Sequence, residues 1–245
     1  MPESIVATNG VSKTYEMGAE TVHALSDVSI EIPRAQYVSI MGPSGSGKST
    51  LFNMVGGLDM PSRGSVTVEG HDLGKLNSRQ LAWFRCHRIG FIFQSFNLIP
   101  TMTALENVRI ARIFSGVSPD QASKDAAKVL DRVGLGHRLD HLPSQVSGGQ
   151  QQRIAIARAL VNEPHIILAD EPTGNLDLKT GEEIINLLIE MKEARSITII
   201  TATHDMKMIS ASDMVVWIRD GQIERVANKG ELEVTVGNID GDTVA

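Results

Sequence analysis

The feature that most constrains this chain is a glycine-rich stretch at residues 42–50, with the sequence Gly-Pro-Ser-Gly-Ser-Gly-Lys-Ser-Thr. It matches G-x-x-x-x-G-K-[ST], a loop whose backbone N–H groups surround nucleotide phosphates. Residues 37–41 before it form an apolar run, and residues 49–55 after it are expected to form a helix that ends at two glycines. A strand, a glycine loop and a helix in this order are the context that the pattern requires, so we predict a nucleotide-binding α/β fold.

The residue types of this loop suit a phosphate anion and its metal ion. Lys48 is expected to reach the β- and γ-phosphates, and the Ser49 hydroxyl to ligate Mg²⁺. The loop amides and the helix start behind them provide positive potential. The residues predicted to bind the nucleotide here are Gly42, Ser44, Gly45, Ser46, Gly47, Lys48, Ser49 and Thr50. The alternative is a plain glycine-rich turn with an exposed lysine.

A second motif is an apolar strand at residues 165–170 that ends in two acids. It has the form of a Walker B segment, in which the terminal aspartate lies beside the Mg²⁺ site. Asp170 is expected to hold the ion, and Glu171 to orient and polarise the attacking water. The alternative is an ordinary surface turn, because acids are common where strands end.

A third motif, Ser147-Gly148-Gly149-Gln150, begins a helix. A serine hydroxyl, free amides and a helix N-terminus together form an anion site, and the glycines allow close approach of a ligand. One γ-phosphate does not require two such sites, unless the second serves the ATP of a partner chain. The motif therefore predicts a head-to-tail dimer, with an ordinary serine helix cap as the alternative.

The rest of the chain alternates between strand and helix patterns. Helical periodicity dominates residues 96–160, and near-continuous apolar runs follow, as in a parallel sheet covered on both faces. The predicted strands are residues 28–32, 37–41, 65–69, 88–93, 165–170, 197–202 and 214–219, and the later helices are residues 122–133, 150–160 and 181–194. We expect one α/β core with a helical insertion between Gln94 and Ile166.

Composition excludes several classes of protein. The 245 residues carry a formal net charge of −6, which argues against a nucleic-acid partner and against direct adsorption to anionic lipid. No apolar run approaches the 18 residues of a membrane span, and the first residues lack a secretory signal pattern. The single cysteine, Cys86, excludes an internal disulfide and fits a reducing compartment.

Together the three motifs resemble the ATP-binding cassette (ABC) family, over about residues 5–223. The resemblance implies a P-loop NTPase core with a mostly parallel sheet, an N-terminal antiparallel β subdomain and an inserted helical subdomain. It divides the single domain at 1–245 into 1–95 and 161–225 (core and β subdomain), 96–160 (helical subdomain) and 226–245 (polar tail). It also implies ATP and Mg²⁺ as ligands, and ATP hydrolysis that drives transport.

The resemblance assigns further residues by their place in the motif order. Gln94 resembles the glutamine that contacts the Mg²⁺ site and communicates with a membrane subunit, and Asp177 lies in a loop resembling the one that crosses the dimer interface. His204 resembles the histidine that contacts the γ-phosphate, and Tyr15 the aromatic residue that stacks on adenine. The implied catalytic residues are Lys48, Glu171 and His204, and the implied metal ligands are Ser49, Gln94 and Asp170.

Residues 171–177, with the sequence Glu-Pro-Thr-Gly-Asn-Leu-Asp, are similar to those of lipoprotein-releasing and macrolide-exporter ATPases. This branch implies a membrane subunit with four helices and a large extracytoplasmic domain. The chain would then be peripheral, at the cytoplasmic face of the inner membrane, and would export or extract a lipoprotein, peptide or drug-like cargo. The alternatives are an importer ATPase, a soluble ABC ATPase and a P-loop kinase.

Overall fold

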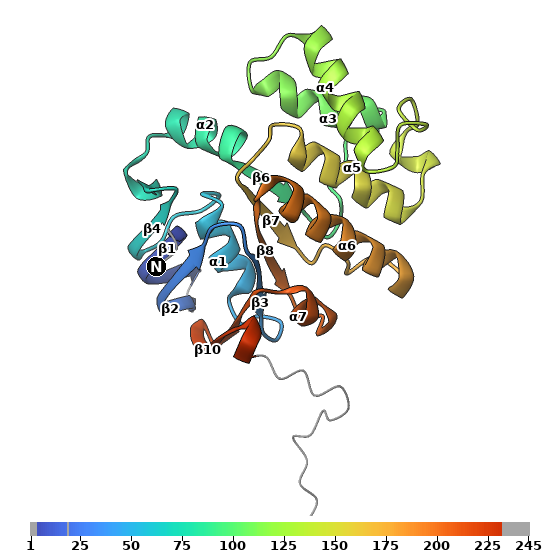
Figure 1. The fold of residues 1–245 in the computed structure, drawn as a ribbon. Coiled ribbons are helices and arrows are strands. Elements are labelled where there is room, and N and C mark those ends of the chain that lie inside the picture. The colour runs from blue at the N-terminus through green and yellow to red at the C-terminus, as the bar shows by residue number, and fades with distance from the viewer. Residues whose placement is uncertain (1–3, 19, 232–245) are drawn as a thin grey trace, which may run out of the picture.

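The computed structural model describes residues 4–18 and 20–231 (Figure 1). Near the N-terminus lies an antiparallel sheet with the strand order β2-β1-β4-β5. Its first two strands form a long ribbon that pairs from Ser4 opposite Pro33 to Met17 opposite Glu20, with register shifts between Ser4 and Thr14. The strands are β1 (Ser4–Met17), β2 (Glu20–Pro33), β4 (Arg63–Val68) and β5 (His71–Asp72).

The second sheet has the order β10-β9-β3-β8-β7-β6, and only the β9–β10 pair is antiparallel. All residues of β3 and β8 are buried, because their apolar sequences are covered on both faces. The strands are β3 (Tyr37–Met41), β6 (Ile89–Ile92), β7 (Ile166–Asp170), β8 (Thr198–Thr203), β9 (Met214–Arg219) and β10 (Gln222–Asn228).

The helices cover both faces of this sheet, and α3 and α4 lie together at the end of the molecule far from the antiparallel sheet (Figure 1). Capping boxes fix the starts of α2, α3 and α5, where Asn77, Thr103 and Ser147 each pair with a residue three positions later. The helices are α1 (Lys48–Val55), α2 (Ser78–Arg88), α3 (Ala104–Phe114), α4 (Pro119–Arg132), α5 (Gly148–Leu160), α6 (Leu178–Arg195) and α7 (Lys207–Ala211).

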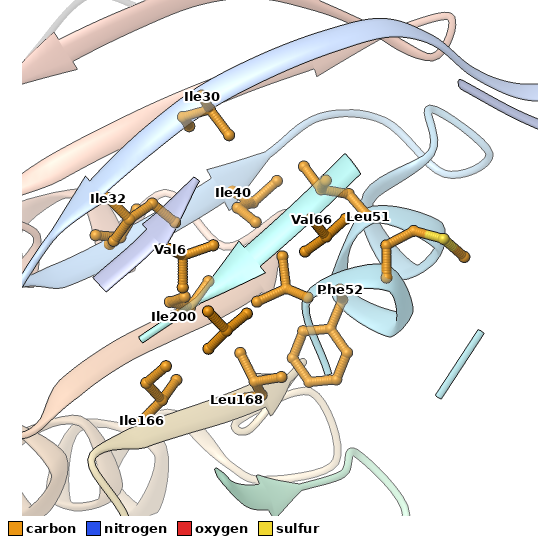
Figure 2. Close-up of a cluster of buried hydrophobic side chains, with 14 of the residues drawn as sticks. Val6, Ile30, Ile32, Ile40, Leu51, Phe52, Val66, Ile166, Leu168 and Ile200 are labelled. Atoms are coloured by element: carbon orange, nitrogen blue, oxygen red, sulfur yellow. The ribbon is translucent and has the colours of Figure 1, made fainter. Parts of the chain in front are cut away.

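One hydrophobic core lies between the two sheets, around α1. Leu51 and Phe52 of α1 pack there with Val66 of β4 and with Leu168 of β7, as Figure 2 shows. A second core joins the other face of the large sheet to α3, α4, α5 and α6. The apolar side chains of the helix that follows the phosphate loop are therefore packed between the two sheets, which gives the loop a rigid support.

Two carboxylates connect elements that are far apart in the sequence. Glu69, after β4, is 8% exposed and pairs with Arg34, with Arg88 and with His165, whose Nδ1 is 2.5 Å from the carboxylate. Asp213, before β9, accepts hydrogen bonds from Tyr37 N (2.9 Å) and Lys192 Nζ (2.7 Å). The first group joins the two sheets, and the second joins β3, α6 and β9.

The predicted fold class is confirmed: an α/β fold with a parallel-rich sheet and an antiparallel β subdomain. Residues 104–160 form the helices α3, α4 and α5. The predicted polar tail begins too early, because residues 226–228 are the last residues of β10 and pair with β9. A 3₁₀ turn at residues 229–231 follows, and the part of the predicted tail at 232–245 lies outside the described residues.

Candidate nucleotide site

The phosphate loop runs from the end of β3 to the start of α1 and is held by neighbours from both sheets. Gly221 N donates to Ser46 O at 3.0 Å, and Ser26 N donates to Gly221 O at 2.9 Å. At Gly47, with φ of 103°, a β-carbon would lie 2.6 Å from Ala24 O, so only glycine fits. The loop therefore has one well-defined path.

Two polar side chains of the phosphate loop, those of Lys48 and Ser46, are buried against the loop itself. The Lys48 ammonium donates to Gly42 O (2.7 Å) and Pro43 O (2.9 Å), and the side chain is almost fully buried. The Ser46 hydroxyl is buried and has no hydrogen-bond partner within the described part of the chain. Neither Ser46 nor Gly42, both predicted to bind the nucleotide, is among the residues that line the cavity beside the loop.

A cavity of about 670 Å³ opens beside this loop. It brings together predicted residues from the phosphate loop, the strand ends and the histidine after β8. The lining residues are Val22, His23, Ala24, Pro43, Ser44, Gly45, Gly47, Lys48, Ser49, Thr50, Gln94, Asp170, Glu171 and His204. The ends of β3, β6, β7 and β8 meet here because parallel strands have their carboxyl ends at one edge of the sheet.

Glu171 is held by two residues from the end of the neighbouring strand. Its Oε1 is 2.7 Å from His204 Nδ1, and its Oε2 accepts a hydrogen bond from Thr203 Oγ1 at 3.1 Å. The Thr203 hydroxyl also accepts from Asp205 N at 3.0 Å, which directs its own proton to the carboxylate. Glu171 thus has a fixed carboxylate at the edge of the cavity.

Asp170 lies next to Glu171 and faces Lys48. Burial raises the pKa of Asp170 above its ordinary value, the charge of Glu171 raises it further, and Lys48 acts in the opposite direction. A cation placed next to Asp170 would therefore stabilise the charged form of this carboxylate.

Ser147, Gly148, Gly149, Gln150 and Asp177 do not line this cavity. The Ser147 hydroxyl accepts from Gln150 N (3.3 Å) while Gln150 Oε1 accepts from Ser147 N (3.0 Å), so the two residues cap α5. Gly149 faces α6, where a β-carbon would be 2.3 Å from Thr180 Cγ2. Asp177 caps α6 and accepts from Thr180 Oγ1 at 2.6 Å.

The structure thus separates the third motif from the first two. In this chain Gly149 is required by the packing of α5 against α6, a contact that the sequence pattern alone did not indicate. The Ser147 end of α5 belongs to a different part of the surface from the phosphate loop.

Three residues of β2 line the cavity although the sequence pattern gave them no binding role: Val22, His23 and Ala24. Tyr15, which sequence reasoning did select, pairs directly with Val22 in the β1–β2 ribbon. The Tyr15 hydroxyl donates to Asp59 Oδ2 at 2.9 Å. Burial alternates in β2 only from Val28 to Ile32, so no alternation marks Val22, His23 or Ala24 as residues that face the loop.

A phosphate loop between a parallel strand and a helix, with an acid-ended strand beside it, defines a P-loop nucleotide-binding ATPase. The sequence model described as "ABC transporter" matches residues 25–174, which is more than half of the chain. The chain belongs to this family: it is an ABC transporter ATP-binding protein, and it hydrolyses ATP.

Similar proteins cover nearly the whole chain. An uncharacterized ABC transporter ATP-binding protein of Thermotoga maritima is 50% identical, over 90% of this chain and 94% of that protein. The lipoprotein-releasing system ATP-binding protein LolD of Shewanella is 41% identical, over 94% of this chain and 100% of that protein.

Among solved structures, the chain resembles the cassette MJ0796 of Methanocaldococcus jannaschii, in a dimeric post-hydrolysis state bound to ADP and Pi. The TM-score is 0.84 at 44% identity, over 91% of this chain and 98% of that chain.

Proposed function

We propose that this chain drives a membrane complex that exports or extracts a lipoprotein, peptide or drug-like cargo, through ATP-dependent closure of two copies. The observation that carries the proposal is that the phosphate loop and the end of β7 share a cavity that residues 147–150 do not line. Lys48, Asp170 and Glu171 line one cavity, whereas Ser147 does not line it. The similarity to LolD over the full length of that protein, and residues 171–177, support export or extraction over import.

Nucleotide binding follows from the phosphate loop. Lys48 leaves the carbonyl oxygens of Gly42 and Pro43 and pairs with the β- and γ-phosphates, while the loop amides and Ser46 surround them. The base lies at the mouth of the cavity, against the Tyr15 ring.

The donor set fits Mg²⁺, because Ser49, Gln94 and Asp170 bring hydroxyl, amide and carboxylate oxygens to one cavity. When bound, Mg²⁺ would neutralise the negative charge that develops on the phosphates. No group of three acidic, histidine or cysteine residues that could hold a metal occurs in the described part of the chain. A nucleotide-bound Mg²⁺ needs only one or two protein carboxylates, so the site is sufficient.

Glu171 orients and polarises the water that attacks the γ-phosphate. Its carboxylate is fixed by Thr203 and lies 2.7 Å from His204, which is 72% exposed in its side chain and can turn toward the γ-phosphate. Positioning and electrostatics supply most of the rate acceleration in phosphoryl transfer, so a fixed carboxylate suits this role.

A second copy completes the site. In a head-to-tail dimer, the Ser147 end of α5 meets the γ-phosphate bound by the other chain, and its helix N-terminus attracts the anion. The Asp177 loop crosses the same interface. One copy alone hydrolyses ATP slowly, because its own cavity lacks these donors.

The membrane partner would dock beside Gln94. A cavity of about 740 Å³ lies between α2, β6, α3 and α5, and Trp83, Phe91 and Phe114 contribute apolar surface to it. Gln94 does not line it, but Phe93, the residue before Gln94, does. Among residues 4–18 and 20–231, no helix is long and apolar enough to cross a membrane. We assign the partner four membrane helices and a large extracytoplasmic domain, which holds the chain at the cytoplasmic face of the inner membrane.

The test of the catalytic scheme is Glu171→Gln, with the exposed Glu190→Gln on α6 as a matched control. The Glu171→Gln chain should bind ATP with Mg²⁺ and accumulate as a dimer in size-exclusion chromatography. Its ATPase rate should fall at least about a hundredfold, which is within the range for a general base. A Glu171→Gln chain that stays monomeric and keeps its ATPase rate would contradict the scheme.

The test of the partner uses tagged Glu171→Gln protein trapped with ATP in detergent-solubilised membranes of its host. Recovery of a four-helix subunit with a large extracytoplasmic domain would support export or extraction. Recovery of a permease with more membrane helices would make the chain an importer ATPase. Recovery of no membrane protein would favour a soluble ABC ATPase.

A further inference from the structure

We propose that Asp59 and Lys13 are positioning residues for the nucleotide base, because together they hold the Tyr15 ring with one face directed to the nucleotide. The inference rests on the proposed stacking of the base on Tyr15 and extends it to the residues behind the ring. These residues come from two different elements: Lys13 from β1 and Asp59 from the turn after α1.

Tyr15 is not among the residues that line the nucleotide cavity, but two of its neighbours, Val22 and Thr50, are. It is directly opposite Val22 in the β1–β2 ribbon, and residues opposite each other in an antiparallel pair direct their side chains to the same face. Val22 lines the cavity together with His23 and Ala24, so the Tyr15 side chain is next to this edge of the cavity. The Thr50 side chain, which lines the cavity at the end of the phosphate loop, is near enough to the Tyr15 hydroxyl to act on its pKa, in the lowering direction.

Asp59 holds the far end of the ring. Its Oδ2 accepts from the Tyr15 hydroxyl at 2.9 Å, and its Oδ1 accepts from Lys13 Nζ and from Met60 N, both at 2.7 Å. Burial opposes ionisation of this carboxyl, but the hydrogen bonds from Lys13 and Met60 outweigh it and lower the pKa of Asp59. Asp59 is therefore a charged acceptor that uses both of its oxygens.

The position of Asp59 is set by the helix of the phosphate loop. Its backbone N–H and that of Leu58 both donate to Asn53 O of α1, at 3.3 and 2.9 Å. The same rigid helix therefore fixes the phosphate loop at its N-terminal end and the Tyr15 hydroxyl, through Asp59, at its C-terminal end. This connection sets the distance between the phosphate site and the base platform.

Lys13 covers one face of the ring. Its Nζ is 4.9 Å from the centre of the Tyr15 ring, donates to Met60 O at 2.8 Å and pairs with Asp59. A cation over an aromatic face is attracted to the ring, and it also occupies that face. The base would therefore stack on the opposite face, and Lys13, which is held by two oxygens, does not serve as a phosphate ligand.

The experiment compares ADP with inorganic pyrophosphate, because only ADP carries the base and neither is hydrolysed by the chain. Dissociation constants for both are measured with Mg²⁺ by calorimetric titration of the full chain. The variants are Asp59→Ala, Asp59→Asn, Tyr15→Phe and Tyr15→Ala. Asp72→Ala is the matched control, because Asp72 also accepts a backbone N–H and pairs with a lysine, but lies on β5.

We expect Tyr15→Ala to weaken ADP binding about tenfold, as base stacking predicts, and to leave pyrophosphate binding unchanged. Asp59→Ala and Tyr15→Phe should each weaken ADP binding about fivefold, since the ring remains but is no longer held. Asp59→Asn should bind ADP with nearly the affinity of the original chain. Its side-chain oxygen still accepts from Lys13, and its amide can donate to the Tyr15 hydroxyl. Asp72→Ala should have no effect.

The outcomes separate this inference from the proposed role of Tyr15. If Tyr15→Ala weakens ADP binding but Asp59→Ala and Tyr15→Phe do not, Asp59 and Lys13 have no positioning role while the base platform stands. If Tyr15→Ala has no effect on ADP, the platform itself is wrong. Equal loss of ADP and pyrophosphate in Asp59→Ala would also overturn the inference, because it would mean a general loosening of the phosphate loop. If Asp59→Ala does not fold, the ADP affinity of Tyr15→Phe decides between these outcomes.

Discussion

At the residue scale, the orientation of the Glu171 carboxylate depends on the uncharged residue Thr203. Glu171 has φ of 45°, which is uncommon for a residue other than glycine, and its N–H donates to Ala202 O of β8 at 2.9 Å. This backbone turn brings the carboxylate across to the end of β8, where Thr203 is fully buried. We therefore regard Thr203 as the residue that fixes the orientation of the Glu171 carboxylate.

Thr203→Val should reduce kcat for ATP hydrolysis about tenfold and leave KM within a factor of two. The substitution removes the hydroxyl that joins Glu171 Oε2 and Asp205 N, and an unpartnered buried polar group costs about 1–3 kcal/mol. Thr203→Ser keeps the hydroxyl and should retain most of kcat. Steady-state kinetics check both, and equal loss in the two variants would show that the hydroxyl is not responsible.

At the element scale, the start of α5 is fitted to the start of α6. Gly149→Ala would place a methyl group 2.3 Å from Thr180 Cγ2, a distance at which either the Thr180 side chain or the two helices must shift. We expect a loss of about 1–3 kcal/mol in the free energy of unfolding, which is typical of overpacking. The measurement is urea unfolding at neutral pH.

The double variant Gly149→Ala with Thr180→Ser is the control for this prediction. Serine lacks the Cγ2 atom but keeps the hydroxyl that donates to Asp177, so most of the stability should return. Thr180→Ser alone gives the baseline. If the double variant is as unstable as Gly149→Ala, the cause is the helix start itself and not its contact with α6.

Elements with a strong local sequence pattern were predictable, whereas elements with few buried residues were not. The strand, loop and helix around Lys48 and the acid-ended strand β7 were predictable because glycine spacing and continuous apolar runs are strong signals. The helix α2 was not predicted, because only Leu81 and Phe84 of its eleven residues are buried and its sequence is mostly polar. β10 was missed for a similar reason, since most of its residues are exposed.

The site was predictable in its residue types but not in its connections. Asp170, Glu171 and His204 were each identified beside a strand end, and the structure brings them to one cavity. The contribution of β2 and the hydrogen bond from Thr203 depend on how strands pair across the molecule, which a single sequence does not show. The roles assigned to the individual residues remain predictions for the variants described above.

At the scale of the whole molecule, Asp213 joins three elements of the large sheet and its helices. Burial opposes its ionisation, but hydrogen bonds from Lys192 and Tyr37 N prevail and lower the pKa of Asp213 below its ordinary value. A carboxyl with a lowered folded pKa stabilises the native state above its unfolded pKa. That stabilisation is lost as the pH falls through the folded pKa.

Asp213→Asn should therefore lower the free energy of unfolding at pH 7 by about 1–2 kcal/mol, the range for a hydrogen-bonded charge. The difference from the original chain should narrow below about pH 4, because protonated aspartic acid and asparagine are then alike. Urea unfolding at pH 7 and pH 3.5 measures both values, with the exposed Asp140→Asn as control. A difference that is constant with pH would contradict the assignment.

The anchoring of the phosphate loop has a consequence for the energetics of the whole cycle. The loop is tied to the β9–β10 turn through Ser46 O and Gly221 N, and pressed against β2 at Gly47. Ordering a backbone costs about 1–2 kcal/mol per residue, and here that entropy is lost when the chain folds. The backbone of the loop is thus ordered before nucleotide binds, and Lys48 has to exchange its hydrogen-bond partners. In the proposed dimer, the interaction energy of each ATP would then be available for bringing the two copies together.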